Sequence, residues 1–241
     1  MHVDETGWRT SGDARALWTA TTPQATFLQI AEHCNREQFN ALIGAYPGIV
    51  ISDRWVGFEH LDPHQRQVCW SHIQRDFRRH AEGLAEQKTF GEQGLELTRR
   101  VFRAWRAFQH EHHDRDRLKA EIAQVQTELR TLLEDASPKS KRTRWHRRFA
   151  NNLLKVWPAL WTFLTVDGVQ PTNNPAERAL RAPVIHRKVS LGTQSENGER
   201  FAERALSAAA TCRLQRRSLF TYLSELITAH TRGDPFPALA A

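Results

Sequence analysis

The spacing of hydrophobic residues along the chain changes from a strand-like to a helical pattern near residue 72. Before that point, short apolar runs alternate with turn residues, as in β-strands joined by tight turns. The predicted strands cover residues 3–9, 16–21, 25–30, 48–53 and 67–70. One short helix, opening at Asn35, is expected before the fourth strand, and a second short helix before the fifth. This order of strands and helices predicts an α/β layer architecture.

From residue 73 onward, apolar residues recur every three or four positions, which is the period of a helix that packs on one side. Two stripes are formed by Leu95, Val101, Phe102, Trp105 and Phe108 and by Leu118, Ile122, Val125, Leu129 and Leu132. The second stripe alternates steps of four and three, as in a helical hairpin or a short coiled coil. A tryptophan-rich helix is predicted at 153–164, with Trp105, Trp157 and Trp161 in the core.

We therefore expect residues 73–166 to form a helical insertion between two parts of one α/β core, residues 1–72 and 167–241. In the second part, Asn174 is the expected N-cap of a helix, with Pro175 at its first position and Glu177 at its third. Two further helices are predicted at 199–213 and 218–230.

The composition is that of an ordinary globular protein. Its 241 residues are 40% hydrophobic and 25% charged, which excludes a disordered or collagen-like chain. Three widely spaced cysteines predict reduced thiols in a cytosolic protein rather than a disulfide framework. The longest apolar run, residues 156–166, is too short to cross a bilayer, and the amino terminus lacks the pattern of a secretory signal. We therefore expect a cytoplasmic protein with no membrane partner.

The net charge of +7 is unevenly distributed along the chain. Residues 1–62 carry a net charge of −4, and residues 63–241 carry a net charge of +11. A basic region can hold a polyanion such as nucleic acid while carboxylates elsewhere bind metal ions. Basic surfaces also occur on proteins that bind no anion, so charge alone gives nucleic acid only a modest advantage among the possible partners.

Three carboxylates lie at transitions where a side chain can be directed into a cleft: Asp4 in the first strand, Asp53 at the end of the fourth, and Glu177 in the first turn of a helix. Converging carboxylates suit a pair of magnesium ions, because hard cations prefer oxygen ligands. Such a pair clamps the attacking and leaving oxygens of a phosphodiester displacement. Asp53 could instead only end its strand, and Glu177 could serve a capping box. Glu203 repeats the string E-R-A-L seen at Glu177 and is an alternative third acid.

Cys69 and His72 have the spacing of a metal-ligand pair. A structural zinc site needs four ligands, and the only nearby candidates, His33 and Cys34, are adjacent residues, which argues against zinc.

A basic segment, residues 139–148, contains six basic residues and no acidic one. Its candidate phosphate-binding residues are Lys141, Arg142, Arg144, Arg147 and Arg148. Trp145 lies among them and could stack on a base, so the segment suits DNA. A solvated basic loop is the alternative interpretation.

Five sequence motifs follow one another along the chain. They are V-D-E-T-G-W-R at 3–9, G-I-V-I-S-D-R-W at 48–55, C-W-S-H at 69–72, P-T-N-N-P-A-E-R-A-L-R at 171–181 and G-T-Q-S-E-N-G-E-R-F at 192–201. Together, and in this order, they resemble the catalytic half of bacterial transposases of the insertion-sequence 66 family.

The resemblance implies an RNase H-like mixed sheet interrupted by the helical insertion. It also implies a DDE transposase that cuts DNA and transfers strands with the help of metal ions. Asp4, Asp53 and Glu177 would be the catalytic and metal-binding triad, holding two Mg²⁺ or Mn²⁺ ions, and Glu177 is preferred over Glu203.

By the same resemblance, Cys69 and His72 would support the active centre. Further DNA contacts are expected from Arg178, Arg181, Arg187 and Lys188. The resemblance implies a longer chain, with a cysteine-containing, helical DNA-binding region before the catalytic part. We therefore expect this chain to be a truncated form of such a transposase.

The partners expected from the resemblance are double-stranded DNA at the transposon ends and target, other copies of the chain on that DNA, and other proteins encoded by the element. The expected location is the bacterial cytoplasm, on the nucleoid. Two alternatives remain: a non-catalytic DNA-binding or assembly remnant, and a two-metal nuclease without strand transfer.

Replacing the five basic residues of the segment 139–148 together by glutamine is expected to weaken binding to any DNA duplex and to flatten its salt dependence. Each lost phosphate contact removes about 0.9 unit from the slope of log K against log salt concentration. Fluorescence anisotropy over a salt series measures the slope, and sequence preference should be unaffected. An unchanged slope would place the DNA elsewhere on the protein.

Overall fold

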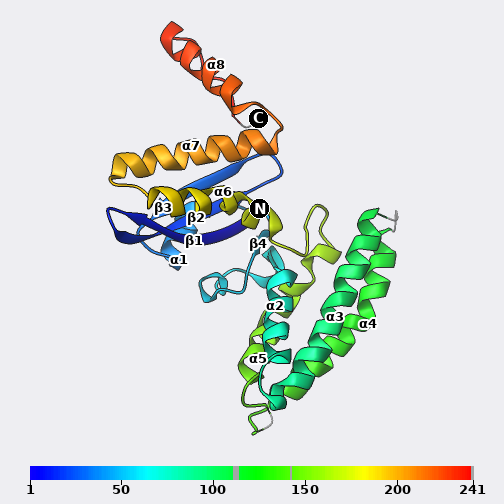
Figure 1. Cartoon of the computed structure of the whole chain (residues 1–241). Coiled ribbons are helices and arrows are strands. Elements are labelled where there is room, and N and C mark those ends of the chain that lie inside the picture. The colour runs from blue at the N-terminus through cyan, green and yellow to red at the C-terminus, as the bar shows by residue number, and fades with distance from the viewer. Residues whose placement is uncertain (111–113, 142, 240–241) are drawn as a thin grey trace. The chain divides into compact units, whose positions relative to one another are not determined.

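The computed structural model describes residues 1–110, 114–141 and 143–239. Tertiary contacts divide the chain into two compact units, Met1–Val50 with Asn173–Ala241 and Ile51–Thr172. The described residues form a mixed five-stranded sheet, with the strand order β3-β2-β1-β4-β5, and eight α-helices (Figure 1). This is an α/β fold with an RNase H-like pattern, as the sequence predicts. Within the described ranges, every helix is too short or too polar to span a bilayer.

In the first unit, β1 (His2–Thr10), β2 (Asp13–Thr21) and β3 (Thr26–Ala31) form the predicted antiparallel meander. The two residues between β1 and β2, Ser11 and Gly12, have φ values of 51° and 92°. A two-residue turn with both φ values positive matches the right-handed twist of the strands that it joins. The meander is therefore encoded by its local sequence.

The helices of the first unit are α1 (Arg36–Ile43), α6 (Asn174–Ser190), α7 (Glu196–Leu214) and α8 (Leu219–Arg232). Asn35 caps α1 as predicted, because its side chain accepts a hydrogen bond from the backbone of Gln38 at 2.9 Å. The helix predicted at 199–213 begins earlier, since Ser195 caps it and accepts a hydrogen bond from Gly198 at 3.1 Å.

The core of the first unit joins strands β1 to β3 to two helices. Its buried members are Trp8, Leu17, Leu28, Ile30, Leu180 and Ala202. The last two belong to α6 and α7, which lie across the strands in Figure 1. Strands and helices thus share one apolar layer, which fixes α6 on β1.

Helix α7 also runs along β3, the edge strand of the sheet, and hydrogen-bonds to its backbone. Glu203, Ser207 and Thr211 accept hydrogen bonds from three N–H groups of β3 at 2.6, 2.9 and 3.0 Å. These N–H groups belong to Ile30, Leu28 and Thr26, in that order. Four helical residues rise about 6 Å and two strand residues span about 6.7 Å. The two periods match, so α7 satisfies alternate donors of the edge.

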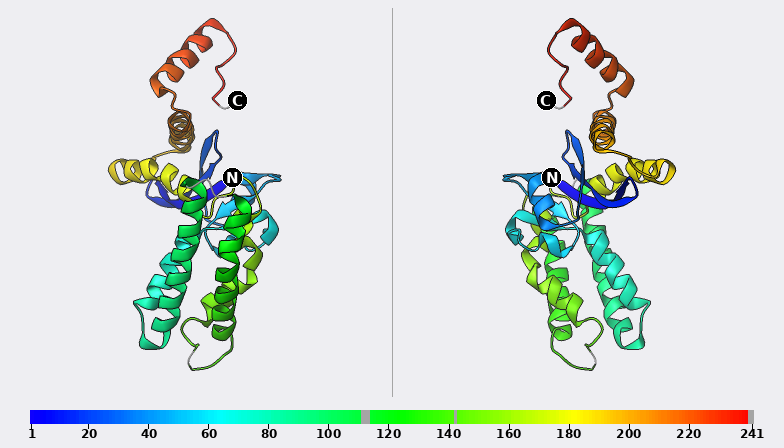
Figure 2. Two further views of the ribbon diagram at one scale, coloured as in Figure 1. Left: turned by 90° about the vertical axis from the view of Figure 1, so that its right-hand side faces the viewer. Right: turned by 90° about the vertical axis from the view of Figure 1, so that its left-hand side faces the viewer.

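In the second unit, β4 (Val50–Ser52), which begins in the first unit, is followed by two short 3₁₀ turns and by β5 (Arg66–Val68). The predicted strand at 67–70 is wrong at its end, because Cys69 is the N-cap of α2 and Trp70 is its first residue. Four helices follow: α2 (Trp70–Ala81), α3 (Ala85–His110), α4 (Arg115–Ala136) and α5 (Arg147–Lys155). Figure 2 shows α3 and α4 side by side, which is the predicted helical hairpin.

The apolar stripe predicted for α4 is correct except at its end, where Leu133 is buried instead of Leu132. The stripe predicted for α3 is largely wrong. Of its members only Val101 is buried, whereas Leu95, Phe102, Trp105 and Phe108 are half-buried. The contact face of α3 is set by two glycines that the stripe ignores.

Gly91 and Gly94 lie where α3 touches α2. A Cβ atom on Gly91 would come within 2.1 Å of the backbone of Ala81, and one on Gly94 within 2.0 Å of the ring of Phe77. Only glycine permits so close an approach, so the buried face follows the glycines rather than the aromatic residues.

The helix predicted at 153–164 is also wrong. Helix α5 ends at Lys155, and two 3₁₀ turns follow, Trp157–Leu160 and Thr162–Leu164. Pro158 lacks the N–H group that a continuing helix would require. Trp161 is buried as predicted, but Trp157 is only half-buried.

These turns cover β5. Thr162 Oγ1 donates to the carbonyl oxygen of Arg66 at 2.6 Å, and the backbone N–H of Phe163 donates to Gln67 Oε1 at 2.8 Å. Gln67 is fully buried, so its amide depends on these protein partners.

Thr211→Val keeps the shape of the side chain but removes the acceptor for the Thr26 N–H group. We expect the free energy of unfolding, measured with urea, to fall by about 1–3 kcal/mol, because a buried donor loses its partner. Thr231→Val is the matched control, since that exposed hydroxyl only donates to carbonyls of its own helix. If both variants lost the same free energy of unfolding, the hydrogen bond from β3 to α7 would not stabilise the edge of the sheet.

Candidate functional site

The candidate site in the first unit lies where α6 meets β1. Asn173 is fully buried, and its Nδ2 donates a hydrogen bond to the carbonyl oxygen of Val3 at 2.8 Å. Helix α6 begins at the next residue, so the predicted N-cap, Asn174, is wrong by one position. Asn173 makes no side-chain capping hydrogen bond. Its side chain instead hydrogen-bonds to β1, a contact that local sequence rules do not predict.

Glu177 lies in the first turns of α6 and is half-buried. Because the helix begins one residue earlier than predicted, Glu177 occupies the fourth helical position, whereas a capping box requires the third. Its backbone N–H donates to the carbonyl oxygen of Asn173 at 3.2 Å. The capping-box interpretation of Glu177 therefore fails, and the residue is left one turn from the contact between α6 and β1.

Asp4 follows Val3 on β1 and is half-buried. Side chains alternate along a strand, so Asp4 is on the same face as Trp8, which packs against Leu180 of α6. The backbone N–H of Glu5 donates to Asp4 Oδ1 at 3.0 Å and orients the carboxylate. The first unit thus carries two acids, Asp4 and Glu177, on the elements that Asn173 ties together.

His2 is buried on β1 next to this contact. Burial lowers the pKa of His2 from 6.5 to about 4, and the positive amino terminus adds to this shift, while a hydrogen bond with Asn173 acts against it. The imidazole is therefore neutral at physiological pH and adds no positive charge beside Asp4.

In the second unit, Asp53 directly follows β4 and is half-buried. Its Oδ1 accepts a hydrogen bond from the backbone of Trp55 at 2.9 Å. Arg66, only 2% exposed, donates from Nη2 to the backbone carbonyl of Asp53 at 2.6 Å. Burial lowers the pKa of Arg66 to about 10, although Asp53 acts to raise it, so the guanidinium remains charged.

Cys69 and His72 lie in the same unit, at the start of α2. The backbone N–H of Cys69 donates to the carbonyl oxygen of Ser52, the residue before Asp53, at 2.9 Å. The buried Cys69 sulfur and a ring nitrogen of the half-buried His72 lie within 4.8 Å of each other. Cys69, His72 and Asp53 therefore share one end of β4 and β5, but this turn offers two of the four ligands of a structural zinc ion.

Glu203, the alternative third acid, belongs to the contact between α7 and β3. Its Oε1 accepts the hydrogen bond from Ile30 N, and burial raises its pKa, although this hydrogen bond acts to lower it. The structure gives this carboxylate a role at the edge of the sheet.

The predicted DNA-binding residues have varied surroundings. Among those of the basic segment, Lys141, Arg144 and Arg148 are exposed, Arg147 is half-buried, and Arg142 lies outside the described residues. The guanidinium of Arg144 lies 4.6 Å from the ring centre of Trp145. On α6, Arg178, Arg181 and Lys188 are exposed. Arg187 donates to the carbonyl oxygen of Gly7, so its guanidinium is partly engaged with β1.

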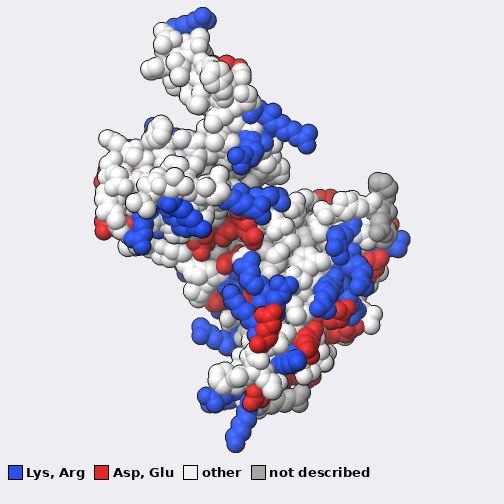
Figure 3. Space-filling model, in the orientation of Figure 1, with Lys and Arg blue, Asp and Glu red and all other residues white. Residues whose placement is uncertain are grey.

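Sequence reasoning missed Asn173, whose role depends on a strand 170 residues away in the chain. It also missed two arginines near the end of α7, Arg213 and Arg216, which the string R-L-Q-R-R at 213–217 could have indicated. Figure 3 shows lysine and arginine side chains gathered over the beginning of α6 and the end of α7.

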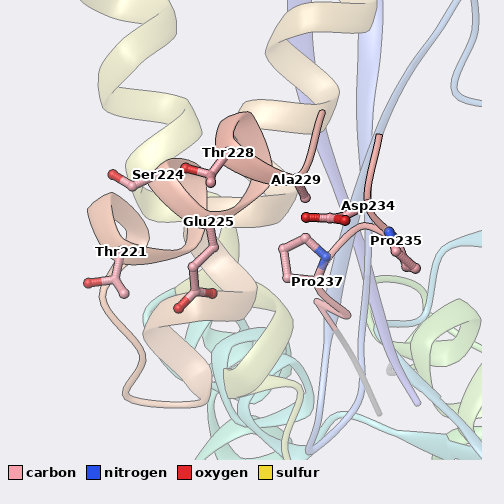
Figure 4. Close-up of a pocket in the computed structure, with 8 residues that line it drawn as sticks. All are labelled: Thr221, Ser224, Glu225, Thr228, Ala229, Asp234, Pro235 and Pro237. Carbon is pink, nitrogen blue, oxygen red and sulfur yellow. The ribbon is translucent and has the colours of Figure 1, made fainter. Parts of the chain in front are cut away.

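A separate hollow of about 480 Å³ lies beside α8 (Figure 4). Its lining residues are Thr221, Ser224, Glu225, Thr228, Ala229, Asp234, Pro235 and Pro237. None of them is basic and none was predicted to belong to a site, so this hollow is distinct from the arrangement around α6.

Comparison with known families gives one match. The family described as "Transposase IS66 family" matches residues 1–200, which include all three predicted acids. No curated protein and no solved structure matches the chain significantly.

The free energy of unfolding should depend on His2 below neutral pH. Between pH 6.5 and about 4 the unfolded chain binds a proton at His2 that the folded chain does not, so stability falls as the pH falls. We expect urea unfolding to show a smaller loss over this range for His2→Gln than for the parent. His64→Gln, at an exposed site, is the control. If the free energy of unfolding fell equally with pH in the parent and in His2→Gln, the conclusion that the buried imidazole is neutral would be wrong.

Proposed function

Because this chain belongs to the IS66 family of transposases, we propose that it is the catalytic domain of a DDE transposase that cuts DNA and joins the cut end to a target. Asp4, Asp53 and Glu177 are the proposed catalytic triad. Cys69 and His72 are proposed to support the active centre, and the helical stretch 73–166 is proposed to be an insertion in the catalytic core.

The observation that carries the proposal is the bond from Asn173 to Val3. It fixes the start of α6, and hence Glu177, on the strand that bears Asp4. Asp53 is included in the proposed triad because it directly follows β4, and β4 is the neighbour of β1 in the strand order.

The donor set suits magnesium or manganese. All three proposed ligands are carboxylates, and hard divalent cations prefer oxygen donors. A backbone N–H group orients one oxygen of Asp4 and one of Asp53, which reduces the conformational entropy lost when a cation binds. When bound, two such ions would supply positive charge to the attacking and leaving oxygens of the phosphodiester.

The proposed reaction has two displacements at phosphorus. In the first, water forms a new P–O bond and the bond to the 3′-oxygen breaks, leaving a 3′-hydroxyl and a 5′-phosphate. In the second, that 3′-oxygen attacks a phosphodiester of the target and displaces the target's own 3′-oxygen. The chain's carboxylates hold the reacting groups in line, and its exposed arginines and lysines bind the DNA backbone.

The proposed partners are double-stranded DNA, at the element's ends and at the target, and further copies of the chain assembled on it. Arg178 and Arg181 follow Glu177 on α6 and are exposed, which supports phosphate binding beside the proposed acid.

Glu177→Gln tests the proposed triad. Glu203→Gln is its control, because it changes the same chemical group within the same local sequence, E-R-A-L. We expect Glu177→Gln to abolish Mn²⁺-dependent DNA cleavage and to reduce the rise in melting temperature that Mn²⁺ produces. A ligand that binds only the folded state adds about 2.7 kcal/mol at a hundredfold excess over its Kd.

Glu203→Gln should retain both properties, because the glutamine oxygen can still accept the hydrogen bond from Ile30. Cleavage and metal stabilisation that persist in Glu177→Gln would remove this residue from the catalytic set. A joined product in a strand-transfer assay separates a transposase from a nuclease.

A further inference from the structure

A groove lies between α6 and α7 on the first unit, with a volume of about 440 Å³. This is within the range of about 300–1,000 Å³ that is typical of small-molecule sites. We call it the arginine groove, because Arg178, Arg181, Arg213 and Arg216 line it. No acidic residue is among its lining residues.

The four arginines are all exposed. Within the described part of the chain, none of them forms an ion pair with a carboxylate, although many arginines of the second unit do. Arg216 is held in the left-handed region, with a φ of 55°, directly after the end of α7. Four unneutralised guanidinium groups around one hollow favour an anion with several negative charges.

Small apolar residues also line the groove, among them Ala179, Ala182 and Ala210, and we call this lining its alanine floor. A duplex presents phosphates to the arginines, but its bases are paired and stacked inside it and offer no flat group to this apolar lining. The alanine floor therefore favours a ligand that carries a flat apolar group as well as phosphates.

Pro183 interrupts the backbone hydrogen bonding of α6 beside the groove. It lies inside α6 and has no N–H group, so it cannot donate the helical hydrogen bond to the carbonyl oxygen of Ala179. Both residues line the groove.

We propose that the arginine groove binds an unpaired nucleotide of a single DNA strand, with its phosphates on the arginines and its base on the alanine floor. Pro175 and Arg178 line the groove and flank Glu177 in the sequence, so the bound strand continues beside the proposed acid. The inference rests on the proposed function for the identity of the nucleic acid. It adds that this surface recognises a strand rather than a duplex.

The test uses the full chain in the presence of EDTA, so that binding is measured without metal-dependent cleavage. A labelled oligonucleotide is titrated by fluorescence anisotropy, first single-stranded and then annealed to its complement. Ala182→Leu fills the floor at an exposed helical position without altering charge. We expect it to weaken single-strand binding on the order of tenfold and to leave duplex binding unchanged.

Arg181→Gln with Arg213→Gln should reduce the salt slope of single-strand binding by about 1.4, since each phosphate contact contributes about 0.7. The control, Arg204→Gln with Arg232→Gln, removes the same charge from exposed positions of α7 and α8 outside the groove. Circular dichroism and thermal melting confirm that each variant is folded.

The proposal is overturned if Ala182→Leu binds the single strand as tightly as the parent does, or if it loses as much affinity for the duplex as for the single strand. It is also overturned if the arginine double variant and its control have the same salt slope for single-strand binding. The triad is judged separately, by Mn²⁺-dependent cleavage in Glu177→Gln. A groove variant that fails to alter binding thus leaves the catalytic proposal intact.

Discussion

The hydrogen bond from Asn173 to the carbonyl of Val3 determines where the first turns of α6 lie. Asn173 is completely buried, so this bond forms where water cannot compete with it, and its loss would leave a buried polar group unsatisfied. Apolar packing of Leu180 against Trp8 holds the next part of α6 on the same strand. The apolar layer stabilises the contact between the two elements, and the buried Asn173 bond fixes the position of the start of α6 along β1.

Two basic side chains close to Asp53 in the second unit are engaged by the surrounding fold. The buried Arg66 donates its hydrogen bonds to the hydroxyl of Ser52 and to backbone carbonyls of Phe58 and Asp53, rather than to the Asp53 carboxylate. The neighbouring Arg54 pairs with Asp76. His2 is kept neutral by burial. The hydrogen bonds of Arg66 and the ion pair of Arg54 therefore hold the segment around Asp53 against β4 and α2.

Local sequence rules were sufficient where the structure depends on local geometry. The Ser11-Gly12 turn fixed the first hairpin, and the cap at Asn35 fixed α1. The rules failed where a distant residue intervened. Asn173 was missed as the N-cap because its side chain serves β1, and the face of α3 was misplaced because Gly91 and Gly94 allow α2 to approach. The proposed catalytic acids could be selected only through family motifs, since spacing alone left Glu177 and Glu203 equivalent.

The side-chain hydrogen bonds between α7 and β3 have a consequence for how the protein behaves at high concentration. An uncovered edge strand invites β-augmentation by another chain and is a common origin of aggregation. Here alternate donors of the edge are occupied by residues of a helix, so an incoming strand would first have to displace α7 and expose the apolar layer beneath it. If several copies assemble on one DNA molecule, as proposed, this cover keeps their β3 edges from pairing with one another.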